Sequence, residues 1–131
     1  MFLYKQGNEV MHFICEEDAK KFYGLDKPDM VISEEEFERA EGLLRVIDGN
    51  IVVGLTQQET IARDQETVRD KRNGLLESVV DKMQGVLRWN NLTPEKQQAW
   101  TKYRQDLLDI TLQPVFNTEP LKVIFPDRPS V

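Results

Sequence analysis

The chain has 131 residues, of which 40% are hydrophobic and 31% charged, and its formal net charge is −6. This length suits one ordinary domain or two very small ones, and the composition is polar but within the globular range. The longest apolar run, Met1–Tyr4, is too short for a membrane span or a signal peptide. The single cysteine, Cys15, cannot form an internal disulfide, which favours a cytosolic protein.

Charge is distributed unevenly along the chain. Residues 1–55 contain six basic and twelve acidic side chains, whereas residues 56–131 contain eleven of each. Nucleic-acid-binding proteins present a surplus of Lys and Arg to phosphate groups, so this balance argues against that class. The step in charge predicts a boundary between a small acidic α+β module, residues 1–55, and a second region, residues 56–131.

Short strands and helices alternate in the first module. Two apolar-rich runs, residues 2–5 and 10–14, flank a turn-like segment and predict a β-hairpin. Residues 16–23 begin with acidic and continue with basic side chains, which favours a short helix ended by Gly24. Residues 30–32 are typical of a brief strand.

Two local signals follow. Ser33-Glu-Glu-Glu36 is a capping box, in which the serine hydroxyl accepts from the backbone N–H three residues later, so it predicts the start of a helix. Asp48-Gly49 lies between two β-branched runs, residues 44–47 and 51–53. That arrangement predicts a second hairpin with a type I′ turn, whose central residues need positive φ.

The second region opens with a long proline-free stretch. Residues 56–88 are rich in polar side chains and predict a helix, with bends at Gly74 or Gly85. Its apolar residues Ile61, Val68 and Leu75 repeat every seven positions, which makes only a thin apolar seam. The following helix is too short to cover the early turns. We therefore expect Ile61 and Val68 to contact another molecule, either a second copy of the chain in a homodimer or a different partner.

A second helix begins at Thr93-Pro94, because threonine is a good N-cap and proline suits the first helical position. Large apolar side chains recur on it at intervals of three and four from Trp100 to Ile110. The short link before it predicts an antiparallel helical hairpin. Four later prolines exclude further helix and predict an extended proline-rich tail, in which residues 122–125 form at best an edge strand.

Candidate chemistry is sparse. With one histidine and one cysteine, the only Cys-His pair is His12 and Cys15, whose odd spacing puts them on opposite faces of a strand. Glu34, Glu38 and Glu41 share a helix face, for which a solvated surface is a better interpretation than a metal site. The sequence thus predicts no catalytic, cofactor-binding or metal site, although a hydrolase with a carboxylate pair stays open as an alternative.

Aromatic residues of the second region have two interpretations. The stripe of Trp100 and Tyr103, with Trp89 nearby, is typical of a hairpin core. The same residue types are frequent in protein-binding hot spots. The partner-binding candidates are accordingly Trp89, Trp100, Tyr103 and Arg104, together with Ile61 and Val68 of the preceding helix.

Two stretches resemble the tail fibre assembly proteins of tailed bacteriophages and the related phage tail assembly chaperones. The first leads from Arg69-Asp-Lys-Arg-Asn-Gly-Leu-Leu76 through Trp89 to Leu92–Ile110, with the pattern Trp-x-x-Tyr-Arg-x-x-Leu-x-x-Ile. The second is the tail, with Gln113-Pro114 and Val123-Ile-Phe-Pro126. Val31–Phe37, followed by an Asp-Gly-Asn hairpin, is similar to the N-terminal module of that family.

This resemblance implies a non-enzymatic chaperone. Such proteins help tail fibre subunits to fold and trimerise, usually by binding the distal C-terminal region of the fibre. It implies a location in the cytoplasm of the bacterial host, or retention on the tail fibre of the virion. The alternatives are a chaperone for the tail tube or tape-measure protein, and a structural component of the virion or baseplate.

Overall fold

The computed structural model describes residues 1–83 and 85–130. The chain divides into two compact units, Met1–Gln58 and Glu59–Val131. The expected boundary at residue 55 lies three residues before this division. Small antiparallel sheets occupy the first unit and helices the second, so the predicted α+β class is correct.

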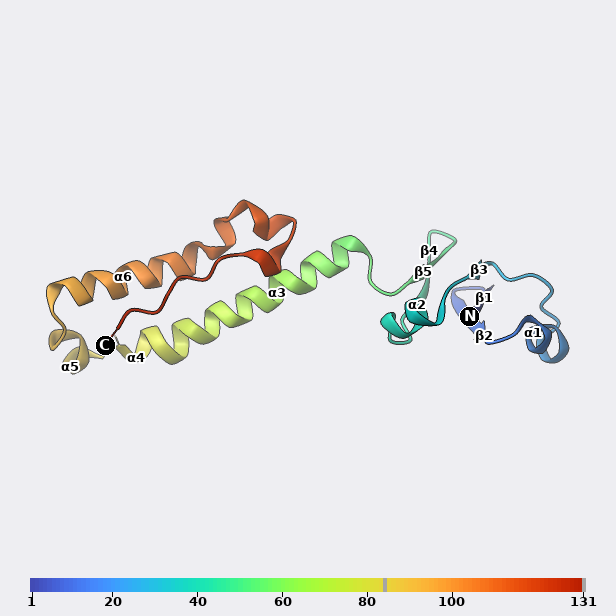
Figure 1. Ribbon diagram of the computed structural model, residues 1–131, viewed down its shortest axis with the longest axis horizontal. Helices are drawn as coiled ribbons and strands as arrows, with labels where there is room; N and C mark the ends of the chain where they lie inside the picture. Colours follow the sequence, from blue (N-terminus) through green and yellow to red (C-terminus); the bar gives the residue numbers. More distant parts are fainter. Residues whose placement is uncertain (84, 131) are drawn as a thin grey trace. The chain divides into compact units, whose positions relative to one another are not determined.

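The first unit begins with a three-stranded sheet (Figure 1). Strands β1 (Phe2–Gln6) and β2 (Glu9–Phe13) form the predicted antiparallel hairpin. Strand β3 (Met30–Val31) pairs antiparallel with the other edge of β1, which gives the order β2-β1-β3.

Two short helices follow strands of this unit. Helix α1 (Glu16–Tyr23) ends as expected at Gly24, which adopts the left-handed conformation with φ 69°. Helix α2 (Glu34–Arg39) begins at the predicted cap, where the Ser33 hydroxyl accepts from the N–H of Glu36 at 3.1 Å. The caps satisfy backbone groups that a helix end leaves without partners.

A two-stranded sheet completes the first unit. Strands β4 (Leu44–Ile47) and β5 (Asn50–Val53) pair antiparallel. The residues of their turn, Asp48 and Gly49, have φ values of 52° and 78°, as the predicted type I′ turn requires. The core of the unit joins both sheets through Leu3, Ile32 and Ile51.

Helices build the second unit. They are α3 (Gln57–Leu75), a π-helical turn (Leu76–Val80), α4 (Asp81–Met83), α5 (Val86–Asn90) and α6 (Pro94–Leu108). The sequence predicted one long helix over residues 56–88, and the structure divides this stretch into several shorter helical elements. Gly85 has ψ 133° and precedes α5, so the bend expected at this glycine is a full break. Helix α6 begins at its predicted cap, where Thr93 accepts from the N–H of Lys96.

The chain after α6 contains three short 3₁₀-helices, η2 (Asp109–Leu112), η3 (Pro114–Asn117) and η4 (Pro120–Lys122). We refer to residues 109–130 as the C-terminal segment. Residues 122–125 form no strand, and the tail expected to be extended is folded into 3₁₀ turns up to Lys122, although no α-helix is described there. Proline starts two of these turns because the first helical position needs no N–H and suits its fixed φ.

Two cores pack the second unit. The first contains Val80 and Met83 from one side of the hairpin and Trp100, Tyr103 and Leu107 from α6. The second joins Val68, which is earlier on α3, to residues that come later than α6. The first helical stretch thus packs against α6 in the predicted antiparallel hairpin. The C-terminal segment lies along both helices (Figure 1).

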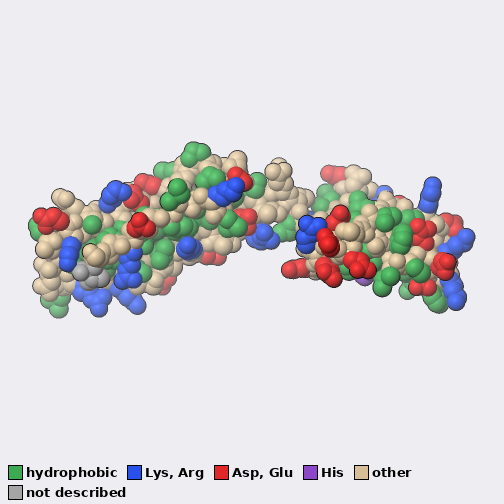
Figure 2. All heavy atoms as spheres, in the orientation of Figure 1, with side chains coloured by type: hydrophobic (Ala, Val, Ile, Leu, Met, Phe, Trp, Pro, Cys, Tyr) green, Lys and Arg blue, Asp and Glu red, His purple; other side chains and the backbone are tan. Residues whose placement is uncertain are grey.

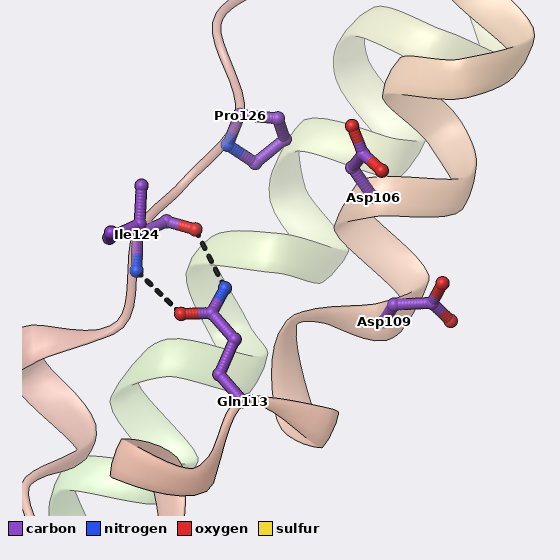
Figure 3. Close-up of a pocket in the computed structure, with 5 residues that line it drawn as sticks. All are labelled: Asp106, Asp109, Gln113, Ile124 and Pro126. Atoms are coloured by element: carbon purple, nitrogen blue, oxygen red, sulfur yellow. Dashed lines mark hydrogen bonds between the residues drawn. The ribbon is translucent and has the colours of Figure 1, made fainter.

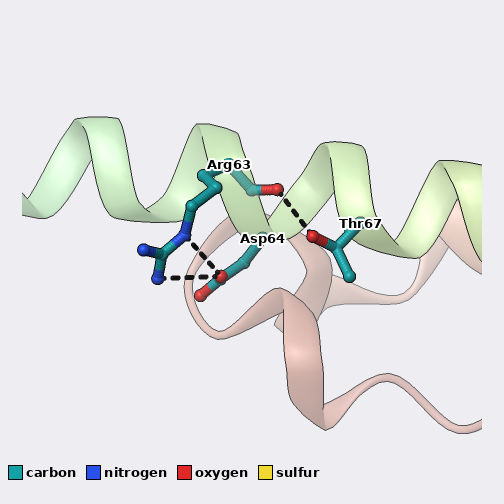
Figure 4. A network of polar contacts seen from close by, with 3 residues as sticks. All are labelled: Arg63, Asp64 and Thr67. Carbon is teal, nitrogen blue, oxygen red and sulfur yellow. Dashed lines mark hydrogen bonds and ion pairs between the residues drawn. The ribbon is translucent and has the colours of Figure 1, made fainter.

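Local polar contacts link neighbouring side chains along α3 (Figure 4). The guanidinium of Arg63 donates to Oδ1 of the neighbouring Asp64 at 3.4 Å, and the Thr67 hydroxyl donates to the Arg63 carbonyl at 3.1 Å. Arg69 and Glu66 form an i,i+3 ion pair at 3.5 Å. Ion pairs between side chains that are largely in water contribute little to stability, so the packed apolar face of the helix decides its position.

A candidate protein-binding surface

The predicted aromatic stripe lies in the core. Trp100 and Tyr103 are 2% and 4% exposed, and their rings meet edge to face with centroids 5.8 Å apart. The core interpretation of Trp100 is therefore correct. Neither side chain offers a surface to a partner in this structure, because both lie between the hairpin's own helices.

The two remaining aromatic-stripe candidates are more accessible. Trp89 is half-buried against the first core, and its carbonyl accepts from Nε2 of Gln97 at 2.9 Å. Arg104 is exposed on α6. A role for these two residues in partner binding stays a prediction.

The expected seam on α3 is covered by the chain itself. Val68 is 3% exposed and packs with Ile110, Phe116 and Val123 of the C-terminal segment. The prediction that Val68 faces another molecule is therefore wrong, because residues after α6 fold back over the early turns of α3. Ile61 is half-buried and belongs to neither core, so its partner role is still a prediction.

Cations on aromatic rings fasten the C-terminal segment to the helices. The Arg69 guanidinium lies 5.3 Å from the ring centre of Phe116, and the Lys71 ammonium lies 4.1 Å from that of Phe125. Nε2 of Gln65 also donates to the Phe116 carbonyl at 3.0 Å. Such contacts are attractive because the face of the ring carries negative charge. The charged face of α3 thus serves to hold the segment.

A hollow opens where α6 meets the C-terminal segment (Figure 3). Its lining consists of Asp106, Asp109, Gln113, Ile124 and Pro126. The Gln113 amide closes one wall by bonding twice to Ile124, since Nε2 donates to the carbonyl and Oε1 accepts from the N–H, each at 2.9 Å. These two hydrogen bonds connect parts of the segment that are eleven residues apart in the sequence.

Three large apolar side chains of the C-terminal segment are exposed, and one of them, Ile124, also lines the hollow. Leu112, Leu121 and Ile124 are 76%, 63% and 78% exposed. The two Gln113 hydrogen bonds join the backbone next to Leu112 to Ile124, and Leu121 precedes Ile124 by three residues. We call these three residues the apolar patch. Exposed apolar surface is a feature of protein-binding sites where it is contiguous, so this segment is the candidate in the second unit.

The first unit has an exposed apolar row of its own. Phe2 lies opposite both Phe13 and Val31 in the sheet, so the three side chains share one face. The ring of Tyr23, at the end of α1, lies 5.4 Å from that of Phe13. Tyr23 and Val31, at the ends of the row, are both exposed, and Figure 2 shows apolar side chains at the surface of each unit.

His12 and Cys15 have different neighbours in the structure. The centre of the His12 ring lies 4.9 Å from that of the Phe37 ring, whereas Cys15 directly precedes α1 and is close enough to Tyr4 to act on its pKa. Carboxylates of α2 are exposed, as expected for a solvated face (Figure 2). Within residues 1–83 and 85–130, no three His, Cys, Asp or Glu side chains are arranged to hold a metal ion. In the same part of the chain, no helix combines the length and the apolar character needed to cross a membrane.

Comparisons with protein-family models, with curated proteins and with solved structures found no match to this chain.

The apolar patch and its hollow were missed from the sequence. Leu112, Leu121 and Ile124 follow no helical or strand period, and Asp106 and Asp109 have the pattern of ordinary surface residues. The one available signal was the density of large apolar residues among the prolines of the tail, which is more than a solvated tail needs.

Proposed function

We propose that this protein is a non-enzymatic chaperone that binds a bacteriophage tail fibre protein during its folding, trimerisation or attachment. The choice of partner comes from the resemblance of residues 69–76, 92–110 and 113–126 to tail fibre assembly proteins. The single structural observation that supports a binding role is the apolar patch.

The patch suits reversible capture. It presents side chains from a segment that is itself fixed by Gln113 and by the second core, so little order has to be created on binding. Unassembled fibre subunits expose apolar surface and unpaired strand edges, which aggregate unless they are covered. A small exposed apolar surface can cover such regions and release them when the subunits trimerise.

Cytoplasmic action in the bacterial host, with or without retention on the fibre, belongs to the same proposal. The acidic balance of residues 1–55 supports a protein partner rather than a nucleic acid. A tail-tube or tape-measure chaperone and a structural virion component are the alternatives that the experiment has to separate.

Co-expression with the adjacent fibre gene, followed by affinity capture of this protein, tests the proposal. We expect the fibre subunit to co-purify and its trimer yield to fall without the chaperone. The double variant Leu112→Ser/Ile124→Ser should lose capture at an unchanged melting temperature. Leu87→Ser is the matched control, since Leu87 is 82% exposed on α5 and lies outside the patch.

Failure of the fibre to co-purify would overturn the assignment of the partner. Co-purification of a tube or tape-measure protein instead would favour the first alternative. Recovery of the protein at fixed copy number in purified virions, without any effect on fibre yield, would favour the structural role.

A further inference from the structure

Strand β3 leaves one edge of the first sheet open. In the order β2-β1-β3 it is an outer strand, and among the described residues only β1 pairs with it. Its neighbour Ile32 exchanges two backbone hydrogen bonds with Met1, at 2.8 Å and 3.0 Å. Bonded pairs alternate with unbonded pairs along an antiparallel ladder, so the adjoining pair of Phe2 and Val31 is unbonded. The N–H and the C=O of Val31 therefore point away from β1.

This edge is accessible and continues past the strand. Val31 is 58% exposed, and within residues 1–83 and 85–130 neither of its backbone groups has a hydrogen-bond partner. Ser33 is also extended, with φ −71° and ψ 160°, so its N–H has the same direction as that of Val31. The Ser33 carbonyl is already used, because it accepts from the N–H of Phe37 at 3.1 Å. The edge thus offers two donors and one acceptor to an incoming strand.

An apolar row ends at the same edge. Phe13, Phe2 and Val31 lie opposite one another across the three strands, with their side chains on one face. In an added strand, the residue opposite Val31 would come next in this row and on this face. Three backbone groups give few hydrogen bonds, so an apolar side chain at that position has to supply further affinity.

The charge beside the edge decides between the possible occupants. Residues 26–36 contain five carboxylates and one ammonium group, that of Lys27. A second copy of the chain would bring the same carboxylates close to one another, which is repulsive, whereas lysine or arginine on a different protein would be attracted. Figure 2 shows acidic side chains beside apolar ones at the surface of the first unit.

We propose that the β3 edge binds an extended segment of another protein, with apolar residues at alternate positions and lysine or arginine at its ends. The segment adds a strand antiparallel to β3, bonds to Val31 and to the N–H of Ser33, and packs an apolar side chain beside Val31. An unassembled β-rich subunit exposes such strands until its own sheets are complete. That the segment belongs to a tail fibre subunit rests on the proposed function, whereas the form of the segment rests on the edge.

A synthetic peptide of alternating valine and threonine, with lysines at both ends, tests the form of the segment without any fibre protein. We expect it to bind the full-length chain in fluorescence anisotropy and to slow hydrogen exchange of the Val31 and Ser33 amides. A peptide with glutamates in place of the lysines should bind at least about tenfold more weakly, and raised salt should weaken the lysine peptide.

N-methylation of the peptide provides a matched pair of probes. In an antiparallel pair the valine opposite Val31 exchanges both bonds with it, so the valine amides face the edge and the threonine amides face away. Methylation of the valine amides should weaken binding at least about tenfold, while methylation of the threonine amides should leave it nearly unchanged.

A variant of the protein tests the same edge. Val31→Lys removes an apolar side chain from the row and adds a charge that repels the lysine peptide, so binding should fall at least about tenfold. The exposure of Val31 lets this variant keep its fold, which its melting temperature checks. Leu87→Lys is the matched control, since it adds the same charge at a side chain that is 82% exposed on α5.

Unchanged exchange of the Val31 amide in saturating peptide would overturn the inference, as would equal binding of the two methylated peptides or full binding by Val31→Lys. Protection of that amide that rises with the concentration of the chain alone would also overturn it, because a second copy would then occupy the edge. A fibre subunit that fails to co-purify while the lysine peptide binds as expected would overturn only the proposed function. A fibre subunit that co-purifies equally with the wild type and with Val31→Lys would overturn only the inference.

Discussion

Replacing Val68 by aspartate should unfold or open the second unit rather than change the oligomeric state. Val68 is 3% exposed and is surrounded by Ile110, Phe116 and Val123. A carboxylate at this position would be buried without a partner, which costs more than about 4 kcal/mol. Truncation by Val68→Ala removes two methyl groups and should cost about 2 kcal/mol, including the cavity that is left.

These magnitudes matter because a small unit has a total stability of about 4–11 kcal/mol. Urea unfolding should show a graded loss from wild type to Val68→Ala to Val68→Asp. Hydrogen exchange should quicken at residues 110–125, where the C-terminal segment would come away from α3. Thr67→Asp is the control, because Thr67 is the exposed neighbour on the same helix and should stay within about 0.5 kcal/mol.

The reasoning would be refuted by a Val68→Asp variant of unchanged stability whose mass by light scattering drops from a dimer to a monomer. In that case the early turns of α3 would meet a second copy of the chain, and the C-terminal segment would not cover them.

Three further predictions concern other parts of the chain. Trp100→Ala should lower the free energy of unfolding by about 3–5 kcal/mol, measured by urea titration, because it empties the centre of the first core. Gln113→Ala should cost about 1–2 kcal/mol and speed hydrogen exchange of the Ile124 amide, since both bonds across the hollow are lost; unchanged exchange would count against them. Burial, with Glu16 and Cys15 nearby, raises the pKa of Tyr4. The folded state therefore favours the neutral phenol of Tyr4. The free energy of unfolding should keep this contribution below pH about 10 and lose it above that pH, where the unfolded chain ionises first. The variant Tyr4→Phe has no phenol to ionise and should show a smaller loss of stability at high pH.

Local signals predicted most of the elements correctly. The Ser33 and Thr93 caps, the Asp48-Gly49 turn and the stop at Gly24 each depend on residues within a few positions of one another. These caps and turns can be predicted from the sequence because the residues that form them lie within a few positions of one another. The apolar period around Trp100 belongs to the same class, and it identified the core of α6.

The C-terminal segment could not be predicted in this way. Its 3₁₀ turns have no regular apolar period, and its contacts with α3 join residues far apart, such as Gln65 and Phe116. The seven-residue repeat of α3 was therefore interpreted as an uncovered seam. In the structure Val68 packs in the second core and Leu75 against the first, so the chain itself covers two of the three residues of the repeat.

The same segment also depends on two residues that were expected to bind a partner and are buried instead. Motif aromatics such as Trp100 and Tyr103 are used to build the hairpin core. Phe125 then packs against both cores and lies under the Lys71 ammonium, so the segment that carries Ile124 is fixed by the interior of the hairpin. The periodic apolar residues of α6 thus build the core that holds the C-terminal segment. The apolar patch on that segment follows no period of its own. Core variants should consequently weaken partner capture in proportion to how far they release the segment, whereas Leu112→Ser/Ile124→Ser should weaken capture without any release.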